Sequence, residues 1–177
     1  MMSMITAVIS AVSFFHGASA RSEPVAPVVT ETVVSAPVSK VWQAFTTKEG
    51  IESWMTAKTE FELRVGSTWR TSYNKDSNLH DDATIQQEVL SFDPERMFSF
   101  RTAKAPKGFP WPEAVLNTWC VIYFEPLDAA KTKVTFRMMG FDETDDSKKM
   151  REFFVGGNRL VMDALVKRFS NSNSTKR

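Results

Sequence analysis

The sequence is poor in the side chains that most catalytic and metal sites require. Its 177 residues include one cysteine, Cys120, and two histidines, His16 and His80. A lone cysteine excludes an internal disulfide and a paired-cysteine metal or redox motif, and its position in an apolar run favours a buried side chain over a nucleophile. The spacings typical of zinc proteases, nucleophile elbows and phosphate-binding loops are also missing. We therefore expect no metal, no bound cofactor and no catalytic cluster.

Net charge is also nearly absent. The 22 basic residues almost cancel the 21 acidic ones, so the chain has no overall field that would attract nucleic acid or an acidic membrane surface. The sequence is rich in apolar side chains, since 42% of its residues are hydrophobic and 12% are aromatic. At this length that composition predicts one folded domain with an ample core.

The N-terminus predicts export. Residues 5–15 form an apolar run too short to span a bilayer, and Ala18, Ser19 and Ala20 form a small-residue cleavage site before Arg21. We interpret residues 1–20 as a signal peptide cleaved after Ala20 and residues 21–27 as a flexible lead-in. Residues 1–4 lack Lys and Arg, which leaves a short membrane anchor as the alternative. The expected location is periplasmic or secreted, with no membrane span after cleavage.

A strand followed by one long helix dominates the C-terminal third. Residues 133–138 alternate between polar and apolar side chains, Gly140 interrupts the alternation, and residues 142–147 supply helix-capping oxygens and negative charge. A helix over residues 144–169 would be about 39 Å long at about 1.5 Å per residue. Its apolar side chains recur every three or four positions, at Met150, Phe153, Phe154, Leu160, Val161, Ala164, Leu165 and Phe169.

Gly156 and Gly157 interrupt this helix pattern. Each glycine lowers helix stability by about 1 kcal/mol relative to alanine in a helix interior. The pair therefore requires a structural or functional explanation. Close packing of the helix on the sheet is the interpretation we favour, and room left for a ligand is the alternative.

The remaining segments predict an antiparallel sheet. Seven strands are expected, at residues 28–34, 60–65, 69–73, 84–92, 97–102, 116–125 and 131–139. Two short helices should follow the first strand, near residues 38–45 and 51–55. Residues 105–113 form a proline-rich loop that is either a lid over a cavity or a plug on the core, and residues 170–177 form a polar tail. Because such a sheet cannot bury its apolar face alone, we predict an α+β fold over residues 28–169, with a curved sheet wrapped around the C-terminal helix.

The order and punctuation of these segments resemble the SRPBCC superfamily of START-like and birch-pollen-allergen-like helix-grip proteins. Within it, the chain is most similar to the family named for activators of the heat shock protein ninety ATPase. The matching segments are 34–45 (VSAPVSKVWQAF), 50–54, 65–69 (VGSTW), 89–97, 124–126 and 132–141 (TKVTFRMMGF). The resemblance implies an apolar cavity between the sheet and the terminal helix, a cavity that this superfamily uses to hold hydrophobic molecules.

The inner faces of the predicted elements indicate where such a cavity would lie. Alternation turns Phe136 and Met138 toward the helix, whose Phe153 and Phe154 should face them. For the strand at 97–102, two facings are open: Phe98 and Phe100 share one side, and the family resemblance implies that Met97, Ser99 and Arg101 face inward. The predicted ligand-binding residues are Trp54, Trp69, Trp111, Phe136, Met138, Phe153, Phe154 and Gly157.

Three functions follow from these features. The first is non-catalytic binding of a hydrophobic small molecule, and the second is a protein-interaction module with a client that docks on Phe109, Trp111 and Trp119. The third is a cyclase-like or hydrolytic enzyme. Its acid-base candidates would be Tyr73, Arg101, Tyr123 and Asn158.

Overall fold

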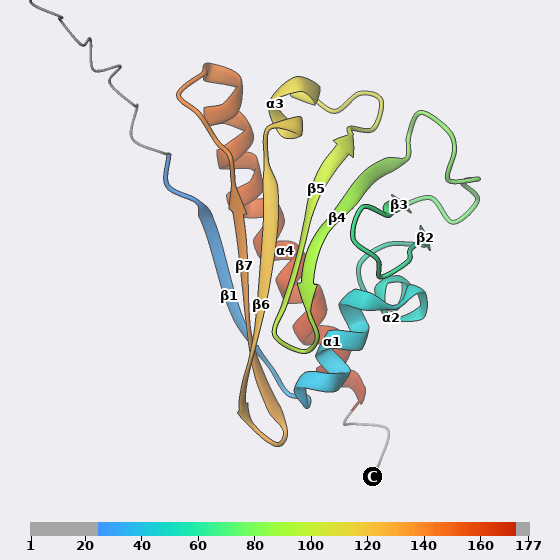
Figure 1. Ribbon diagram of the computed structural model, residues 1–177, viewed down its shortest axis with the longest axis vertical. Helices are drawn as coiled ribbons and strands as arrows, with labels where there is room; N and C mark the ends of the chain where they lie inside the picture. The colour runs from blue at the N-terminus through green and yellow to red at the C-terminus, as the bar shows by residue number, and fades with distance from the viewer. Residues whose placement is uncertain (1–24, 173–177) are drawn as a thin grey trace, which may run out of the picture.

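The computed structural model describes residues 25–172 of the chain. The predicted signal peptide, most of the predicted lead-in and the end of the polar tail lie outside the described residues. Seven antiparallel strands form one curved sheet in the order β1-β7-β6-β5-β4-β3-β2, and α4 lies against one of its faces (Figure 1). The predicted α+β architecture, with a curved sheet wrapped around a long C-terminal helix, is confirmed.

The sheet is built mainly from neighbours in sequence. Its strands are β1 (Val28–Val34), β2 (Lys58–Glu60), β3 (Thr68–Ser72), β4 (Ile85–Asp93), β5 (Met97–Lys104), β6 (Trp119–Asp128) and β7 (Lys131–Met139). The one long-range pairing joins β1 to β7, with Val28 opposite Met138 and Val34 opposite Thr132. The helices α1 (Val38–Thr46) and α2 (Lys48–Glu52) follow β1, as predicted, and lie at one end of the sheet (Figure 1).

The turn from β7 into α4 (Asp145–Ser172) depends on a glycine and a set of side-chain caps. Gly140 has φ +91°, and a Cβ at this position would collide with the carbonyl oxygen of Asn117. Thr144 Oγ1 accepts a hydrogen bond from the Ser147 amide at 3.3 Å, and Ser147 Oγ accepts one from the Asp142 amide at 2.9 Å. The helix therefore starts next to the predicted position, and it extends three residues beyond the predicted end.

The core is most complete at the end of the sheet near α1. Phe45 lies in edge contact with Phe124 and Trp54, with ring centroids 5.3 and 5.0 Å apart. Met162 and Leu165, from the second half of α4, are also buried in this core. These side chains fill the space between the sheet and α4 at this end of the molecule, which we call the closed end. Among residues 25–172, no helix combines the length and the apolar character needed to cross a membrane.

The strand predicted at residues 60–65 is wrong over most of its length. β2 covers only Lys58–Glu60, and residues 61–67 form a loop before β3. The alternation in the sequence arises because Phe61 turns inward, where its ring lies 5.4 Å from that of Trp69. The loop then bonds to β4, since Gly66 N donates to the carbonyl oxygen of Val89 at 2.8 Å. Phe61 and Leu63 thus pack against the core from a loop, whereas Val65 is 57% exposed.

Three other segments also differ from the prediction, each over a few residues. Residues predicted as loop and strand form a short helix, α3 (Pro112–Leu116), because proline suits the first helical position. The predicted turn after residue 125 is replaced by a longer β6, which passes through Pro126 with a register shift. Val25, in the predicted flexible lead-in, packs against the core, and Arg151 Nε donates to the Ala26 carbonyl oxygen at 3.2 Å.

Candidate functional site

A cavity of about 330 Å³ lies between the inner face of the sheet and the first half of α4. Every strand from β3 to β7 contributes to its wall, together with α3, α4 and the loops after α2 and β5. The lining residues are Met55, Thr56, Trp69, Thr71, Tyr73, Ile85, Gln87, Phe100, Thr102, Ala105, Pro106, Phe109, Val115, Cys120, Phe136, Met138, Phe153, Phe154, Asn158 and Val161. Its volume is within the range of about 300–1,000 Å³ found for small-molecule sites.

Aromatic rings form the sheet side of the cavity. The ring of Phe100 lies 5.1 Å from that of Trp69 and 6.4 Å from that of Phe136. Phe98, on the same side of β5, is completely buried. The structure thus decides the facing of β5 in favour of Phe98 and Phe100, because two large apolar side chains gain more from burial than Arg101 would.

A second group of rings borders the cavity where α4 meets the loop after β5. We call Phe109, Trp111, Phe153 and Phe154 the rim cluster. The ring of Phe153 lies 5.8 Å from that of Trp111 and 6.2 Å from that of Phe109. Phe153 remains 52% exposed although it lines the cavity. The cavity therefore reaches solvent beside this ring.

Five of the eight predicted ligand-binding residues line the cavity: Trp69, Phe136, Met138, Phe153 and Phe154. Trp54, Trp111 and Gly157 do not. Trp54 packs in the core near α1, where its Nε1 donates to the Ala44 carbonyl oxygen at 2.9 Å. Trp111 contacts Phe153 in the rim cluster but does not itself line the cavity.

The double glycine of α4 does not pack against the sheet. A Cβ added to Gly156 would have nothing within 4 Å, and one added to Gly157 would meet only Phe153 Cε1, at 4.0 Å. The interpretation of close packing is therefore wrong. Gly156 is exposed, so the space beside it opens to solvent, outside the cavity wall.

Two carboxamides, Gln87 and Asn158, line the cavity. Neither is among the predicted ligand-binding residues, although Asn158 is one of the four acid-base candidates. Gln87 lies on β4 between Ile85 and Val89, which share its face of the sheet. That period-two pattern was the signal that would have located it. Asn158 matched the pattern of a helix-surface residue, yet it is only 7% exposed. Gln87 Oε1 and Asn158 Nδ2 are buried and have no hydrogen-bond partner in the described protein.

The cavity carries no formal charge. None of its lining residues is an aspartate, glutamate, lysine, arginine or histidine. Burial raises the pKa of the Cys120 thiol far above its usual range, so this side chain stays protonated and acts as a small apolar group. Cys120 has none of the positive neighbours in the lining that would activate a nucleophilic thiolate.

The acid-base candidates are divided between two faces of the sheet. Asn158 and Tyr73 line the cavity, with Tyr73 at its edge and 70% exposed. Arg101 and Tyr123 lie on the outer face, where Arg101 Nη2 pairs with Glu88 Oε2 at 2.6 Å. The sheet separates these two pairs, so the four side chains do not form one catalytic group.

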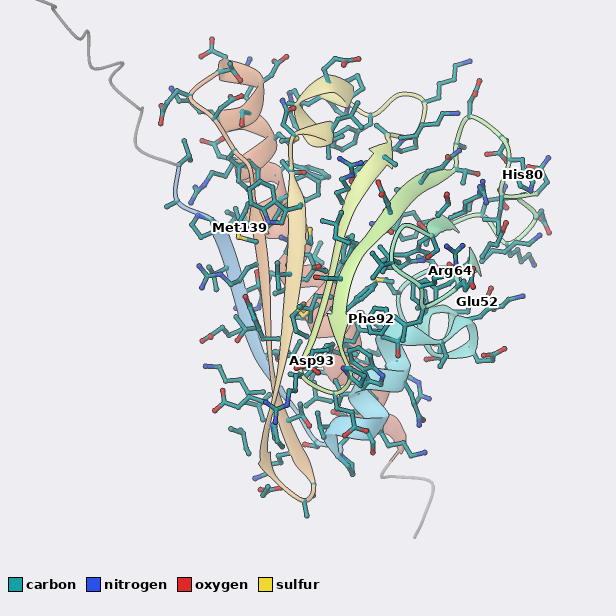
Figure 2. The ribbon with its side chains drawn as sticks, viewed as in Figure 1. Glu52, Arg64, His80, Phe92, Asp93 and Met139 are labelled. Carbon is teal, nitrogen blue, oxygen red and sulfur yellow. The ribbon has the colours of Figure 1, made fainter. Side chains whose placement is uncertain are left out.

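The predicted interaction patch is divided as well. Phe109 and Trp111 belong to the rim cluster. Trp119 lies on the outer face of the sheet, 40% exposed, and pairs in register with Met139, which is labelled in Figure 2. Phe109 and Trp111 therefore lie on a different face of the molecule from Trp119, and the three rings do not form one patch.

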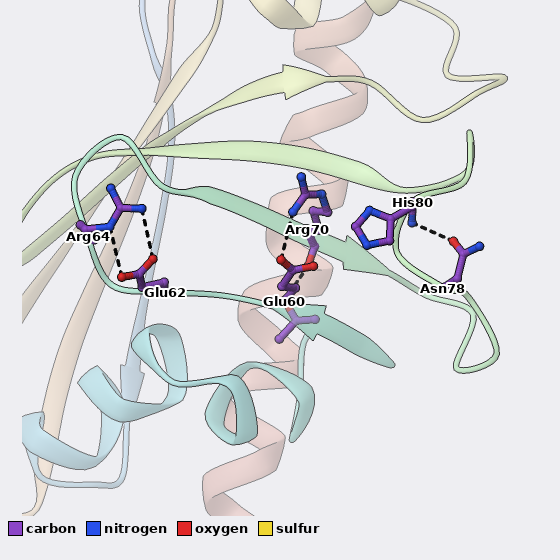
Figure 3. Close-up of polar contacts among 7 residues, drawn as sticks. Glu60, Glu62, Arg64, Arg70, Asn78 and His80 are labelled. Atoms are coloured by element: carbon purple, nitrogen blue, oxygen red, sulfur yellow. Dashed lines mark hydrogen bonds and ion pairs between the residues drawn. The ribbon is translucent and has the colours of Figure 1, made fainter.

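The polar residues of the segment from β2 to β4 form local contacts with one another. Figure 3 shows Arg64 paired with Glu62 and Arg70 paired with Glu60, both at 3.1 Å, and the His80 backbone amide donating to Asn78 Oδ1 at 2.8 Å. The nearby Asp81 carboxylate accepts hydrogen bonds from Ser77 and Thr84, and these bonds lower its pKa. Within the described part of the chain, no group of three or more His, Cys, Asp or Glu side chains could hold a metal ion.

Comparison with known proteins places the fold in context. Residues 35–170 match the family model described as "Activator of Hsp90 ATPase homolog 1-like protein". No curated protein has a significant sequence match to this chain.

Three solved structures illustrate the likeness. A Mesorhizobium loti protein is 21% identical with a TM-score of 0.65, over 82% of this chain and 97% of that one. A Nitrosomonas europaea protein is 17% identical with a TM-score of 0.64, over 83% and 96%. The Aha1 dimer of Colwellia psychrerythraea is 21% identical with a TM-score of 0.57, over 78% and 95%. At these identities the likeness supports the fold alone.

Proposed function

Because this chain belongs to the Activator of Hsp90 ATPase homolog 1-like protein family, whose fold serves as a ligand-binding or interaction module, we propose that it binds an apolar small molecule between its sheet and α4. The observation that carries this proposal is the unfilled cavity of about 330 Å³ with an almost entirely apolar lining. An apolar ligand in this cavity exchanges contacts with water for contacts with the apolar lining.

The driving force for binding is burial of apolar surface. Removing apolar surface from water contributes about 25 cal/mol per Å², and the rings of Trp69, Phe100 and Phe136 provide flat surfaces for an aromatic or aliphatic ligand. No bound cofactor and no covalent step enter this function. Phe153 and Tyr73 are the exposed lining residues beside which a ligand would enter.

The test is a binding titration with a variant that fills the cavity. Cys120→Phe adds a ring inside the cavity from β6, while Val121→Phe adds the same ring one residue later, on the outer face of the sheet. We expect naphthalene, an apolar fluorescent probe of two-ring size, to bind the wild type and Val121→Phe, and to bind Cys120→Phe at least tenfold more weakly. Circular dichroism should show that both variants remain folded.

Native mass spectrometry of protein isolated from its own cells provides an independent measurement. We expect a bound apolar molecule that organic solvent extracts. If the wild type binds neither the fluorescent probe nor any extractable molecule, the cavity is not a binding site and the proposal fails.

We also propose that the mature protein acts outside the cytosol. The support is the apolar run at residues 5–15 followed by the small residues before Arg21. Cell fractionation of the full chain, compared with a chain lacking residues 2–20, tests the proposal. Equal cytosolic recovery of both chains would contradict export.

A protein client is a second candidate function. It is favoured by two aromatic side chains on the outer face of β6, because Trp119 is 40% exposed and Tyr123 is 46% exposed. If a client docks on this face, Trp119→Ser should abolish its cross-linking in cells while leaving probe binding in the cavity unchanged.

A further inference from the structure

Two buried polar atoms without hydrogen-bond partners belong to the cavity lining. Among the described side chains, only Arg70 Nε, Gln87 Oε1 and Asn158 Nδ2 are buried and unpaired. Arg70 lies on the outer side of β3, where its other nitrogen pairs with Glu60. The other two atoms belong to residues of the same cavity. Buried polar atoms are normally paired, so each unpaired one requires an explanation.

Other polar groups near the cavity do find partners in the protein. Trp69 Nε1 donates to Thr59 Oγ1 at 2.9 Å, and Thr59 Oγ1 donates in turn to the Arg70 carbonyl oxygen at 2.8 Å. The fold therefore satisfies the polar atom of its largest lining side chain. Gln87 Oε1 and Asn158 Nδ2 stand out because they are buried without a partner in the lining of the cavity.

The carboxamides occupy two different walls. Gln87 lies on the sheet, in register with Trp69 on one side and Thr102 on the other, next to an irregularity between Gln86 and Gln87 in the pairing of β4 with β5. Such irregularities redirect side chains at binding sites. Asn158 projects from α4 and lies on the cavity side with Phe154 and Val161, which precede and follow it by about one helical turn.

The two atoms have opposite hydrogen-bonding character. Asn158 Nδ2 is a donor and requires an acceptor, whereas Gln87 Oε1 is an acceptor and requires a donor. An ionised group would find no opposite charge in the lining, and burying an unpaired charge is far more costly than burying a neutral polar group. The cavity therefore suits a neutral polar group.

The volume sets the size of the ligand. A protein cavity of about 150 Å³ holds one benzene molecule, so the cavity of about 330 Å³ corresponds to about two fused rings. Resting on the proposed function, we infer that this cavity selects an uncharged, mostly apolar molecule of two-ring size that carries a hydrogen-bond acceptor for Asn158 and a donor for Gln87, as a phenol or hydroxy-ketone does.

Four matched two-ring probes test this inference: naphthalene, 2-methoxynaphthalene, 2-naphthol and 2-naphthoate. Their affinities at pH 7 are measured by quenching of tryptophan fluorescence, because Trp69 lines the cavity. A net hydrogen bond corresponds to about fivefold in affinity. We expect about fivefold tighter binding for 2-methoxynaphthalene than for naphthalene, a further gain for 2-naphthol, and the weakest binding for 2-naphthoate.

Variants assign each preference to one side chain. Asn158→Leu should remove the advantage of 2-methoxynaphthalene over naphthalene, and Gln87→Met should remove the advantage of 2-naphthol over 2-methoxynaphthalene. Gln86→Met is the matched control, because the preceding side chain points to the opposite face of β4, and it should leave all four affinities unchanged. Thermal melts establish that each variant is folded.

The possible failures are distinguishable. If the wild type binds naphthalene but binds the other neutral probes no more tightly, or if 2-naphthoate binds as well as 2-naphthol, the inference is overturned while the proposed function stands. Preferences that persist unchanged in both variants also overturn it. If no probe binds at all, the proposed function fails first and this inference fails with it.

Discussion

Two aromatic clusters lie at opposite ends of the space between the sheet and α4. They differ more in solvent exposure than in the distances between their rings. In the closed-end cluster, made of Trp42, Phe45, Trp54 and Phe124, neighbouring ring centroids are 5.0–5.5 Å apart. In the rim cluster they are 5.3–6.2 Å apart. Phe45 is 1% exposed, whereas Phe153 is 52% exposed. Similar ring contacts thus occur in a sealed core and beside an open cavity.

The two clusters also divide α4 into halves with different tasks. Met162 and Leu165, in the second half, are fully enclosed. The first half also has one fully buried residue, Met150, but it carries the exposed Phe153 and the unpaired amide nitrogen of Asn158. Stability should therefore depend on the closed end, while the rim end tolerates exposed rings and an unsatisfied donor because it faces a cavity.

The largest expected effect is at the closed end. Phe45→Ala should lower the free energy of unfolding by about 3–5 kcal/mol, because it removes a buried ring and leaves a cavity among packed neighbours. Urea denaturation followed by circular dichroism measures the change. A loss below about 1 kcal/mol would show that the closed end repacks, and the contrast between the clusters would disappear.

The next effect should have the opposite sign. Asn158→Leu should raise the free energy of unfolding of the ligand-free protein by about 1 kcal/mol, because it replaces a buried, unpaired donor by an apolar group of similar size. The same urea titration measures the change. Destabilisation by this substitution would mean that the amide is paired in solution and that the rim end is as well satisfied as the closed end.

A smaller effect on stability is expected at the rim. Phe153→Ala should change the free energy of unfolding by less than about 1 kcal/mol, because its ring is half exposed and loses little transfer energy. The same substitution should weaken binding of naphthalene severalfold, since the ring of Phe153 lines the cavity. Equal destabilisation by Phe153→Ala and Phe45→Ala would remove the distinction between the two ends.

The sequence predicts inward-facing side chains best where they lie on long, regular elements. Alternation in β7 and three-and-four spacing in α4 depend on local periodicity, so the positions of Phe136, Met138 and Leu165 follow from them. The same periodicity predicts a strand at residues 60–65, because a loop that packs Phe61 and Leu63 against the core produces a similar sequence pattern. The two cases differ in backbone pairing, because β2 ends at Glu60 and the loop bonds to β4 instead, with Gly66 N donating to Val89 O and Val89 N donating to Ser67 O.

The cavity lining depends on contacts that no local pattern encodes. Trp54 has an aromatic side chain like the lining residues, yet its indole bonds to α1 and leaves it in the closed end. Gln87 and Asn158 are polar residues, so hydrophobic patterns assign them to the surface. Their burial follows from the approach of β4 and α4, which are far apart in the sequence.

The smallest expected effect concerns the start of α4, at the rim end. The Asp142 carboxylate accepts hydrogen bonds from the Thr144 hydroxyl and the Thr144 amide, and these bonds hold the pKa of Asp142 below its usual value. A carboxyl whose pKa is lower in the folded state stabilises that state above its unfolded pKa, and the contribution is lost as the pH falls through the folded pKa. Because Asp142 is exposed, solvent weakens the effect, and it should be confined to the first turn of the helix.

Amide exchange at Ser147 should accelerate relative to an unstructured peptide as the pH is lowered through this range, while protection at Met162 stays constant. Asp142→Asn should remove the pH dependence at Ser147. A parallel loss of protection at both positions would mean that α4 opens as one unit, and its two halves would then not be independent.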